Sequence, residues 1–441
     1  MRNHGRIALT VVLALALALA AAACGSSDEG GGSGNAAATG NEDVSGSVSF
    51  MGIWTGEEQA SFQAVIDAFN EQFPNVKVKY NPVGDNLPTV LSTAVSGGNP
   101  PDLAEVAQPG LIQGFVDQGA LKPIDFAQED MKANFDDSIL QVGTFDSKLY
   151  GLLFKSANKS TIWYNVAAFE DAGVEPPDDW ATLLEDAKTI KSSGLPAYSI
   201  GGADGWTLTD LFENLYLRIA GAEKYDQLSK HEIPWTDQSV KDTLKEMAKV
   251  YGDKDNIVGS TQGALQTDFP GSVSNVFTDN PKGAMVMEGD FVAGAVKTTL
   301  KPEEGYNVFP FPNVNGSAPA VMGGGDIVIM FKDTPAAQAF VKFLATPEAA
   351  EAWAKRGGFS SANKNLDTSV YPDPILKKTA SAIAEADTFR FDLSDLQPAA
   401  FGATVGQGLW KDFQDFLANP SDVDGTAQTM ETQAKKAFAG Q

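Results

Sequence analysis

The sequence predicts an α/β protein that is long enough for two domains. Short apolar segments of strand length alternate with amphipathic segments of helical length, which is typical of mainly parallel sheets flanked by helices. About 394 of the 441 residues follow a low-complexity start, too many for one ordinary hydrophobic core. No internal repeat is visible. We therefore expect two α/β domains and justify their elements in chain order.

The first part of the globular region begins with a strand. Residues 47–54 alternate apolar and polar and then become wholly apolar, as a strand that enters a buried sheet does. Apolar residues at helical spacing follow as far as Pro74, and Thr55 with Glu58 fits a capping box at the start of that helix. We expect further strands at 76–80 and 103–106 and a helix at 87–95.

A second series of strands and helices begins near Tyr150. Apolar runs of strand length alternate with longer segments whose apolar residues recur every three to four positions. Trp163, Trp180, Trp353 and Trp410 lie within such regular patterns, so we expect them to pack in cores. We expect strands at 161–164, 197–200, 283–288 and 326–331, and helices at 180–193, 211–219, 335–345 and 410–417.

Composition excludes several classes of function. The chain has 57 acidic and 32 basic residues and a formal net charge of −25, which argues against binding to nucleic acid or to anionic lipid. Its two histidines are His4 and His231, so a multi-histidine zinc site is impossible, and we expect neither a metal nor a cofactor. A Ser-His-Asp triad would need His231, for which a surface position is the simpler interpretation. Carboxylate-pair chemistry, as in glycosidases, stays open.

The N-terminal segment 1–23 has the organisation of a secretory signal peptide. Arg2 and Arg6 precede an unbroken apolar run that ends in alanines directly before Cys24. Residues 21–24 resemble the lipobox of bacterial lipoproteins, although Ala21 stands where that motif usually has leucine. We expect a diacylglyceryl anchor on Cys24, the only cysteine, and hence a mature chain without disulfides. An uncleaved membrane helix is the alternative, because the apolar run just reaches spanning length.

A linker follows the expected lipid anchor. Residues 24–47 consist mainly of glycine, serine, asparagine and alanine with scattered acids, and they show no apolar period. This composition predicts a flexible coil that spans about 27 Å. We therefore expect an extracytoplasmic protein that is held at the cell membrane by its lipid while its globular part reorients freely.

Several stretches of the globular part resemble one known family. The matching passages follow one another in the family's order and together cover nearly all of residues 48–441. The family is that of the extracellular solute-binding proteins of ABC importers, specifically the carbohydrate-binding group that includes maltose-binding protein. The passages are 69–78 (FNEQFPNVKV), 96–102 (SGGNPPD), 150–153 (YGLL), 163–165 (WYN) with Trp180 opening a helix, and 283–291 (GAMVMEGDF).

The resemblance implies a monomeric, non-enzymatic receptor whose two lobes close on a carbohydrate and present it to ABC transporter permease subunits. Lobe 1 would comprise residues 48–157 and 318–360, and lobe 2 residues 158–317 and 361–441. The segments that cross between the lobes would lie near 156–159, 309–322 and 357–361. The cargo would be a sugar, with an oligosaccharide as the expected size.

Side chains at strand ends form the candidate binding site. Ligands of helix-covered parallel sheets bind at the carboxyl ends of the strands. A sugar needs flat apolar faces against its C–H surfaces, and carboxylates or amides for its hydroxyl groups. The candidates, which lie at strand ends, in loops, on a crossing segment or in passages shared with the family, are Trp54, Glu57, Glu58, Glu105, Gln108, Asn158, Lys159, Asp204, Trp206, Glu288, Asp290, Phe291, Gly325, Asp326 and Phe401.

Most of these candidates also have a purely structural interpretation. Trp54 could pack in the core, and the glycines before Asp326 could serve only as a flexible hinge. Trp206 follows a glycine-rich loop in which a large aromatic side chain has little core to fill, which favours stacking on a ligand. Lys159 lies where the family's maltose-binding members use a carboxylate, so the identity of the ligand cannot be copied from them.

Two rival functions remain open at this point. The same two-lobed trap could bind a polyol phosphate or another anion, which would require converging basic side chains. The basic residues near the expected site are Lys155, Lys159 and Arg356, which counts against an anion. A secreted glycosidase that uses two carboxylates is the second rival, and the resemblance opposes it.

Overall fold

The computed structural model describes residues 43–296 and 299–439. The predicted signal peptide, the predicted lipid site Cys24 and the linker as far as residue 42 lie outside these residues. Within the described ranges, none of the helices is both long and apolar enough to span a bilayer. The first strand begins at Gly46, one residue before the predicted start.

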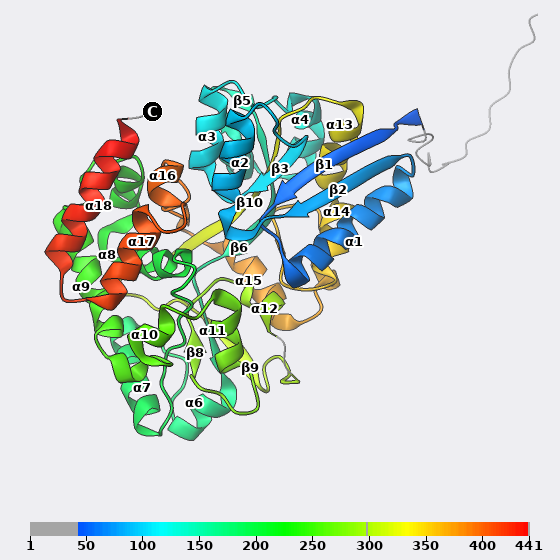
Figure 1. Cartoon of the computed structure of the whole chain (residues 1–441). Coiled ribbons are helices and arrows are strands. Elements are labelled where there is room, and N and C mark those ends of the chain that lie inside the picture. Colours follow the sequence, from blue (N-terminus) through cyan, green and yellow to red (C-terminus); the bar gives the residue numbers. More distant parts are fainter. Residues whose placement is uncertain (1–42, 297–298, 440–441) are drawn as a thin grey trace, which may run out of the picture. The chain divides into compact units, whose positions relative to one another are not determined.

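The larger sheet has seven strands and is mixed (Figure 1). Its order is β11-β6-β10-β3-β1-β2, with β12 paired beside β10. Strand β1 runs parallel to β2 and β3, whereas β10 runs antiparallel to both β3 and β6. The strands are β1 (Gly46–Gly52), β2 (Val76–Pro82), β3 (Leu103–Val106), β6 (Gly151–Asn158), β10 (Val321–Met330), β11 (Ser360–Ser361) and β12 (Phe389–Phe391).

Helices cover both faces of this sheet. Alternate side chains of a strand point to opposite faces, so Val328 and Met330 of β10 join one core while Ile327 and Ile329 join another. The first core contains residues of α1, α13 and α14, and the second contains residues of α2 and α3, which lie on the opposite side in Figure 1. These helices are α1 (Gly56–Gln72), α2 (Leu87–Ser96), α3 (Pro109–Asp117), α13 (Pro335–Leu344) and α14 (Pro347–Ala354).

The predicted capping box at the start of α1 is wrong in its contacts. Thr55 is the N-cap residue, but its side chain makes no capping hydrogen bond. Glu58 instead accepts a hydrogen bond from Lys155 Nζ at 2.5 Å. The charge of a distant lysine therefore competes successfully with the local backbone for this carboxylate.

The smaller sheet has three strands, in the order β8-β7-β9. Strand β7 runs antiparallel to both neighbours, so the predicted mainly parallel arrangement is wrong for this sheet. The predicted strand 197–200 is also absent, because Tyr198 forms only isolated bridges to Ile257 and Met285. The strands are β7 (Thr161–Asn165), β8 (Met285–Val286) and β9 (Tyr306–Pro310).

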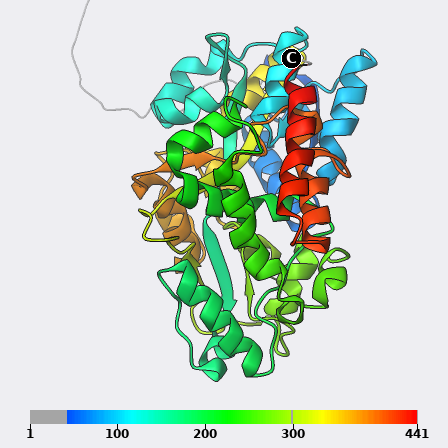
Figure 2. The same ribbon diagram turned by 90° about the vertical axis from the view of Figure 1, so that its left-hand side faces the viewer.

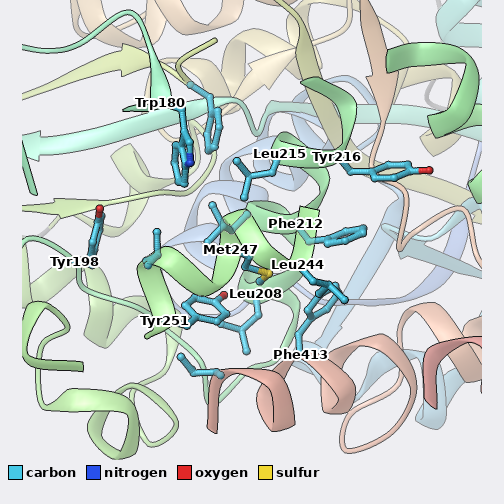
Figure 3. Packing of buried hydrophobic residues seen from close by; sticks show 14 of the residues in the cluster. Trp180, Tyr198, Leu208, Phe212, Leu215, Tyr216, Leu244, Met247, Tyr251 and Phe413 are labelled. Carbon is cyan, nitrogen blue, oxygen red and sulfur yellow. The ribbon is translucent and has the colours of Figure 1, made fainter. Parts of the chain in front are cut away.

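One large core joins the smaller sheet to the C-terminal helices. Ile162 and Tyr164 of β7 face this core, whereas Trp163 faces a separate apolar cluster on the other side of the sheet. Figure 3 shows Phe212 and Leu215 of α8 packed with residues of α9 and α17. Figure 2 shows α18 in red beside these elements. The helices are α7 (Trp180–Ser192), α8 (Trp206–Ser229, kinked at Gly221), α9 (Gln238–Tyr251), α17 (Gly408–Ala418) and α18 (Val423–Phe438).

Shorter elements connect these layers. A small hairpin pairs β4 (Thr144–Phe145) with β5 (Lys148–Leu149). The remaining helices are α4 (Gln128–Asn134), α5 (Asp137–Val142), α6 (Val166–Ala172), α10 (Ser260–Ala264), α11 (Phe269–Val276), α12 (Val292–Ala295), α15 (Pro374–Glu385) and α16 (Ala399–Gly402), with 3-10 turns at Gly84–Asn86, Asp125–Ala127, Lys254–Asn256 and Thr368–Val370.

The chain passes between the two sheets more than once. Strand β6 belongs to the larger sheet and β7 to the smaller one, so the chain crosses at residues 159–160. It returns between β9 and β10, within residues 311–320. The return explains why β10 runs antiparallel to β3 and β6. Strand β10 enters the larger sheet from the smaller sheet, and not from a helix that crosses over the larger sheet. The predicted lobe boundaries stay a prediction.

Candidate functional site

A buried ion-pair group lies between the neighbouring strands β6 and β10 and the start of α1. Lys155 of β6 pairs with Glu58 at 2.5 Å and lies 3.6 Å from Asp326 of β10. The indole Nε1 of Trp54 donates a 2.7 Å hydrogen bond to Asp326 Oδ2. Burial lowers the pKa of Lys155, but the charges of Glu58 and Asp326 outweigh it and raise the pKa above its ordinary value. Lys155 is therefore a charged, fully paired cation.

Trp54 is fully buried and contacts this ion-pair group through its indole N–H. Its ring contacts Phe62 at 4.7 Å and Trp353 at 4.8 Å between centroids, so its faces pack in the core. What it offers to the site is the hydrogen bond to Asp326. The predicted packing positions of Trp163, Trp180, Trp353 and Trp410 are confirmed, because all four side chains are buried.

Glu105 and Gln108 add acceptor oxygens at the end of β3. Glu105 is fully buried, and its Oε2 accepts a 3.0 Å hydrogen bond from the Ile53 backbone N–H. Burial raises the pKa of Glu105 well above its ordinary value, and the charge of Asp326 raises it further. Glu105 Oε1 and Gln108 Oε1 have no hydrogen-bond partner among the described residues. Both atoms are thus available acceptors inside the protein.

A second buried group surrounds Lys159, on the first crossing segment. Its Nζ donates to Asp392 Oδ2 at 2.5 Å and to Asp210 Oδ1 at 3.1 Å. Burial raises the pKa of Asp210 to about 7, although Lys159 acts in the opposite direction. Asp395 lies close enough to raise the pKa of Lys159, and burial raises the pKa of Asp395 itself. Acidic groups therefore outnumber the cation.

The turn after β12 carries the acids of this second group. Asp392 Oδ1 accepts hydrogen bonds from the Ser394 hydroxyl at 2.7 Å and from the Asp395 backbone N–H at 3.0 Å. Glu213 of α8 accepts the backbone N–H groups of Leu393 and Ser394 at 2.5 and 3.0 Å. These bonds fix the turn against α8, and they place Asp392 at Lys159.

Three aromatic rings form the apolar part of the site. Trp206, Phe269 and Phe291 contact one another, with ring centroids 5.3 to 5.7 Å apart. Lys159 Nζ lies 5.7 Å from the centre of the Trp206 ring, which links this trio to the second ion-pair group. Asp204 accepts a 2.6 Å hydrogen bond from the Phe269 backbone N–H. The half-buried Trp206 offers part of an aromatic surface beside carboxylates, the combination that sugars require.

The loop from Glu288 to Phe291 connects the trio to β6 and β11. The Asp290 backbone N–H donates to the Asn158 carbonyl at 2.9 Å, and its carboxylate accepts the Ser360 hydroxyl at 2.5 Å. Burial raises the pKa of Asp290 to about 6. Glu288 is also buried, and its Oε2 has no hydrogen-bond partner within the described part of the chain. This loop thus presents two buried carboxyl groups and an aromatic ring.

Three other candidates have positions that bear on their predicted roles. Gly325 lies directly before the point where β10 shifts its register against β6. A side chain at this position would collide with the Lys155 carbonyl oxygen, so close packing explains why the residue is glycine. Phe401 is buried in the second-sheet core against Trp235. Glu57 is exposed in the first turn of α1.

His231, for which a surface position was expected, is half-buried. Its Nε2 lies 3.1 Å from Glu431 Oε2, and its ring stacks on Phe438. No group of histidine, cysteine or acidic side chains in the described ranges is arranged to hold a metal ion. The contacts of His231 with α18 account for its position without a catalytic role.

Sequence reasoning missed Phe269 of the aromatic trio, together with Asp210, Asp392, Asp395 and Ser360. Asp210 lies one helical turn after Trp206 in α8, so its spacing from a favoured aromatic candidate was an available signal. Asp392 and Asp395 follow a three-residue strand too short to be recognised from periodicity. Ser360 carried no signal, because nothing in its neighbourhood indicates that it reaches Asp290.

The chain matches a known family over most of its length. The family model described as bacterial extracellular solute-binding protein matches residues 54–351. The osmoprotective compounds-binding protein GgtB of Synechocystis sp. is 31% identical over 394 residues, which cover 88% of this chain and 91% of that protein. The alpha-glucosides-binding periplasmic protein AglE of Rhizobium meliloti is 32% identical over 396 residues, with 86% and 85% covered.

Solved structures agree with this fold. The bacterial solute receptor AcbH, described with an exclusive preference for β-D-galactopyranose, superposes with a TM-score of 0.78 at 22% identity. The alignment covers 90% of this chain and all of that one. At this identity the likeness shows the fold alone, which is the two-lobed α/β fold of these receptors. The prediction of a two-lobed α/β protein is thereby confirmed.

Proposed function

This chain belongs to the bacterial extracellular solute-binding proteins, and from that premise we propose that it captures a neutral carbohydrate between two lobes and delivers it to an ABC importer. The expected size of the cargo is an oligosaccharide. Capture shifts the population of the receptor toward the form in which both lobes contact the ligand. The chain acts as a receptor and not as an enzyme.

One observation carries the carbohydrate assignment. At the end of β3, in α8 beside Lys159 and in the loop that carries Phe291, buried oxygen atoms of carboxyl and amide groups have no donor among the described residues. Buried acceptors without donors are unfavourable by about 1–3 kcal/mol each, so a bound molecule rich in hydroxyl groups would relieve them. The atoms are Glu105 Oε1, Gln108 Oε1, Asp210 Oδ2 and Glu288 Oε2.

The same residues disfavour an anionic cargo. Lys155 and Lys159 already pair with carboxylates, and Arg356 donates to Ser61 Oγ at 3.1 Å. A phosphate beside Lys155 and Lys159 would therefore meet a surplus of buried acids, and both of these lysines are already paired. A carboxylate-pair glycosidase is also disfavoured, because the relatives GgtB and AglE are both named as binding proteins.

The names of these relatives support a sugar-like cargo but do not agree on one compound. GgtB is named for osmoprotective compounds and AglE for alpha-glucosides. We infer that this chain takes a neutral, hydroxyl-rich compound of the same kind. The lipid on Cys24, cleavage after residue 23, the tether 24–47 and a monomeric receptor complete the proposal, together with lobes at 48–157 plus 318–360 and at 158–317 plus 361–441.

A thermal-shift panel tests the assignment. Purified mature protein is mixed with maltose, sucrose, trehalose, D-galactose, glycine betaine or glycerol 3-phosphate, each at millimolar concentration. A ligand at 100 times its Kd stabilises the folded state by about 2.7 kcal/mol, which is a clear shift in Tm. Stabilisation by at least one neutral sugar supports the proposal. Stabilisation by glycerol 3-phosphate or glycine betaine alone contradicts it.

A further inference from the structure

Arg218 of α8 is a buried cation without a carboxylate partner. It is 6% exposed, and within residues 43–296 and 299–439 no acid acts against burial, which lowers its pKa to about 9. A buried charge that lacks a counter-ion is strongly unfavourable. The reason for an arginine at this position must therefore lie in the hydrogen bonds that its guanidinium group makes.

The guanidinium group bonds to both ends of the segment by which the chain returns from the smaller sheet to the larger one. Its Nη2 donates to the Phe311 carbonyl at 3.2 Å and to the Ala320 carbonyl at 2.7 Å. Its Cζ also lies over the Phe311 ring, 4.8 Å from the ring centre. One side chain of α8 thus holds the whole return segment 311–320, a task that suits a planar group with several donors.

Asn214, one helical turn earlier in α8, connects Arg218 to the first crossing segment. Arg218 Nη1 donates to the Asn214 carbonyl at 3.1 Å and to its side-chain Oδ1 at 3.2 Å. Asn214 Nδ2 donates to the Lys159 carbonyl at 2.9 Å, and Asn214 Oδ1 accepts the Ser160 hydroxyl at 2.5 Å. Ser160 Oγ in turn accepts the Met322 backbone N–H at 2.8 Å. The same buried network therefore holds both crossing segments against α8.

The cores of the two sheets meet within strand β10. Met322 packs in the core that joins the smaller sheet to α8, whereas residues 327–330 pack in the cores of the larger sheet. Between them, residues 323–325, all glycine, pair with residues 156–158 of β6. A glycine backbone changes conformation at low cost. We call the elements packed in the first core the smaller-sheet body, and those packed in the other cores the larger-sheet body.

We propose that Arg218 and Asn214 are positioning residues that fasten both crossing segments to the smaller-sheet body. The strand pair formed by residues 156–158 and 323–325 is then the joint on which the two bodies rotate. This inference rests on the proposed function, because it assumes that the two bodies close on a ligand. It assigns the crossing segments to one body, and it places the bending on the far side of them, next to the larger sheet.

The fastening also positions a residue of the candidate site. Because Asn214 holds the Lys159 carbonyl, the Lys159 ammonium group stays at Asp210 of the same helix and at Asp392. Without Arg218, the return segment and Lys159 move independently of α8, and fewer molecules close correctly. Apparent affinity falls by the same factor as that competent fraction, so Kd for Arg218→Met should rise about tenfold.

Spin labels measure directly which body the return segment follows. Cysteines replace, two at a time, Glu129 in α4, Lys188 in α7 and Ala318 in the return segment, in the mature chain with Cys24→Ser; all three positions are exposed. Helix α4 packs on the larger sheet and α7 on the smaller one. Pulsed electron paramagnetic resonance gives the label distances with and without the sugar that stabilises wild type in the thermal-shift panel. The sugar should change the distance between positions 129 and 318 and leave that between 188 and 318 unchanged.

Variants test the fastening without any ligand. In Arg218→Met, the distribution of distances between positions 188 and 318 should be broader than in wild type. Arg218→Lys keeps the charge but not the fork of donors, so it should fall between the two. Lys224→Met is the matched control, because Lys224 is a second cation of α8 and its partner Asp237, 2.9 Å away, precedes α9 in the same body. It should match wild type in distances and in Kd by calorimetry.

The same measurements separate fastening from stabilisation. A residue that only stabilises the fold would lower the Tm but leave the distances and the Kd unchanged well below that temperature. The Tm of each variant verifies that the labelled protein is folded. If Arg218→Met does not fold, Arg218→Lys provides the same comparison of distances and Kd.

Two results would overturn the inference while the proposed function stands. One is a distance between positions 188 and 318 that changes when the sugar binds to wild type, or a distance between 129 and 318 that does not. The other is a folded Arg218 variant with the distances and Kd of wild type. A wild-type chain that binds none of the four sugars of the panel overturns the proposed function and the rotation with it, whereas the ligand-free distances still decide whether Arg218 fastens the segment.

Discussion

Replacement of Trp206 by alanine separates ligand stacking from packing. The ring contacts Phe269 at 5.4 Å and Phe291 at 5.7 Å, so the variant loses two aromatic pairs. Each such pair contributes about 0.5–1.5 kcal/mol beyond the burial of the ring, and loss of a mostly buried tryptophan costs about 3–5 kcal/mol in total, so the free energy of unfolding should fall by about 3–5 kcal/mol. A domain of this size retains its fold after such a loss.

The loss of ligand affinity can be worked from the exposed part of the same ring. Because Trp206 is half-buried, a sugar can cover about 80 Å² of it, roughly a third of the surface of a large aromatic side chain. At about 25 cal/mol per Å², that contact contributes about 2 kcal/mol, so Kd should rise about 30-fold. Calorimetry with the sugar that stabilises wild type in the panel measures this change.

Trp206→Phe is the matched control, because it keeps an aromatic face on the same helix. It should recover most of the affinity, with a Kd within about fivefold of wild type. An unchanged Kd in folded Trp206→Ala would refute the stacking role of this residue. Equal losses in both variants would show that the indole N–H, which hydrogen-bonds the Asp85 carboxylate, and not the ring face, carries the effect.

Three further changes test the buried charges and the backbone. Lys155→Met leaves the carboxylate of Asp326 without its cation, so urea unfolding should show a loss of about 3 kcal/mol; an unchanged midpoint would contradict the pairing. Gly205→Ala places a Cβ 2.8 Å from Trp410 Cβ, at a residue whose φ of +84° favours glycine. The Tm should therefore fall by an amount equivalent to about 1–3 kcal/mol of unfolding free energy. An unchanged Tm would show that the start of α8 can shift to make room. Burial raises the pKa of Asp412 to about 7, so its folded form holds a proton that the unfolded chain releases near pH 4, and stability falls as pH rises from 4 to 7. Asp412→Asn should therefore be more stable than wild type by about 4 kcal/mol at pH 8 and nearly equal to it at pH 4, in urea melts at both values; the same difference at both would refute the titration.

Local elements were predictable where a pattern extends over many residues. The amphipathic helices α1, α7 and α13 lie within about two residues of their expected bounds, because their apolar faces repeat over several turns. The segment 197–200 has the composition of a strand and exchanges backbone hydrogen bonds with Met285 of β8, but the pairing stays at isolated bridges because β8 is only two residues long. The composition of a segment indicates that it is buried, but whether it pairs as a strand depends on segments far away in the chain.

The site was predictable in its residue types but less so in its pairings. Glu58 and Asp326 were both expected at strand ends, yet only the register of β10 against β6 brings Lys155 to them. Lys159 was recognised as a reversal of charge relative to the resemblance. Its acidic partners lie more than 50 and 230 residues away along the chain, and no local pattern connects them.

The two lysines determine what the site can accept. Lys155 and Lys159 lie four residues apart, and each is neutralised by carboxylates from separate elements. Because these cations are already paired, the remaining capacity of the site consists of acceptors and of carboxyl groups whose pKa burial raises, such as Glu105 and Glu288. Acceptor oxygens without a donor of their own fit the hydroxyl groups of a neutral ligand better than an anion. The neutral cargo that we propose for this acidic chain thus rests on the pairing of its buried lysines, not on the sum of its surface charges.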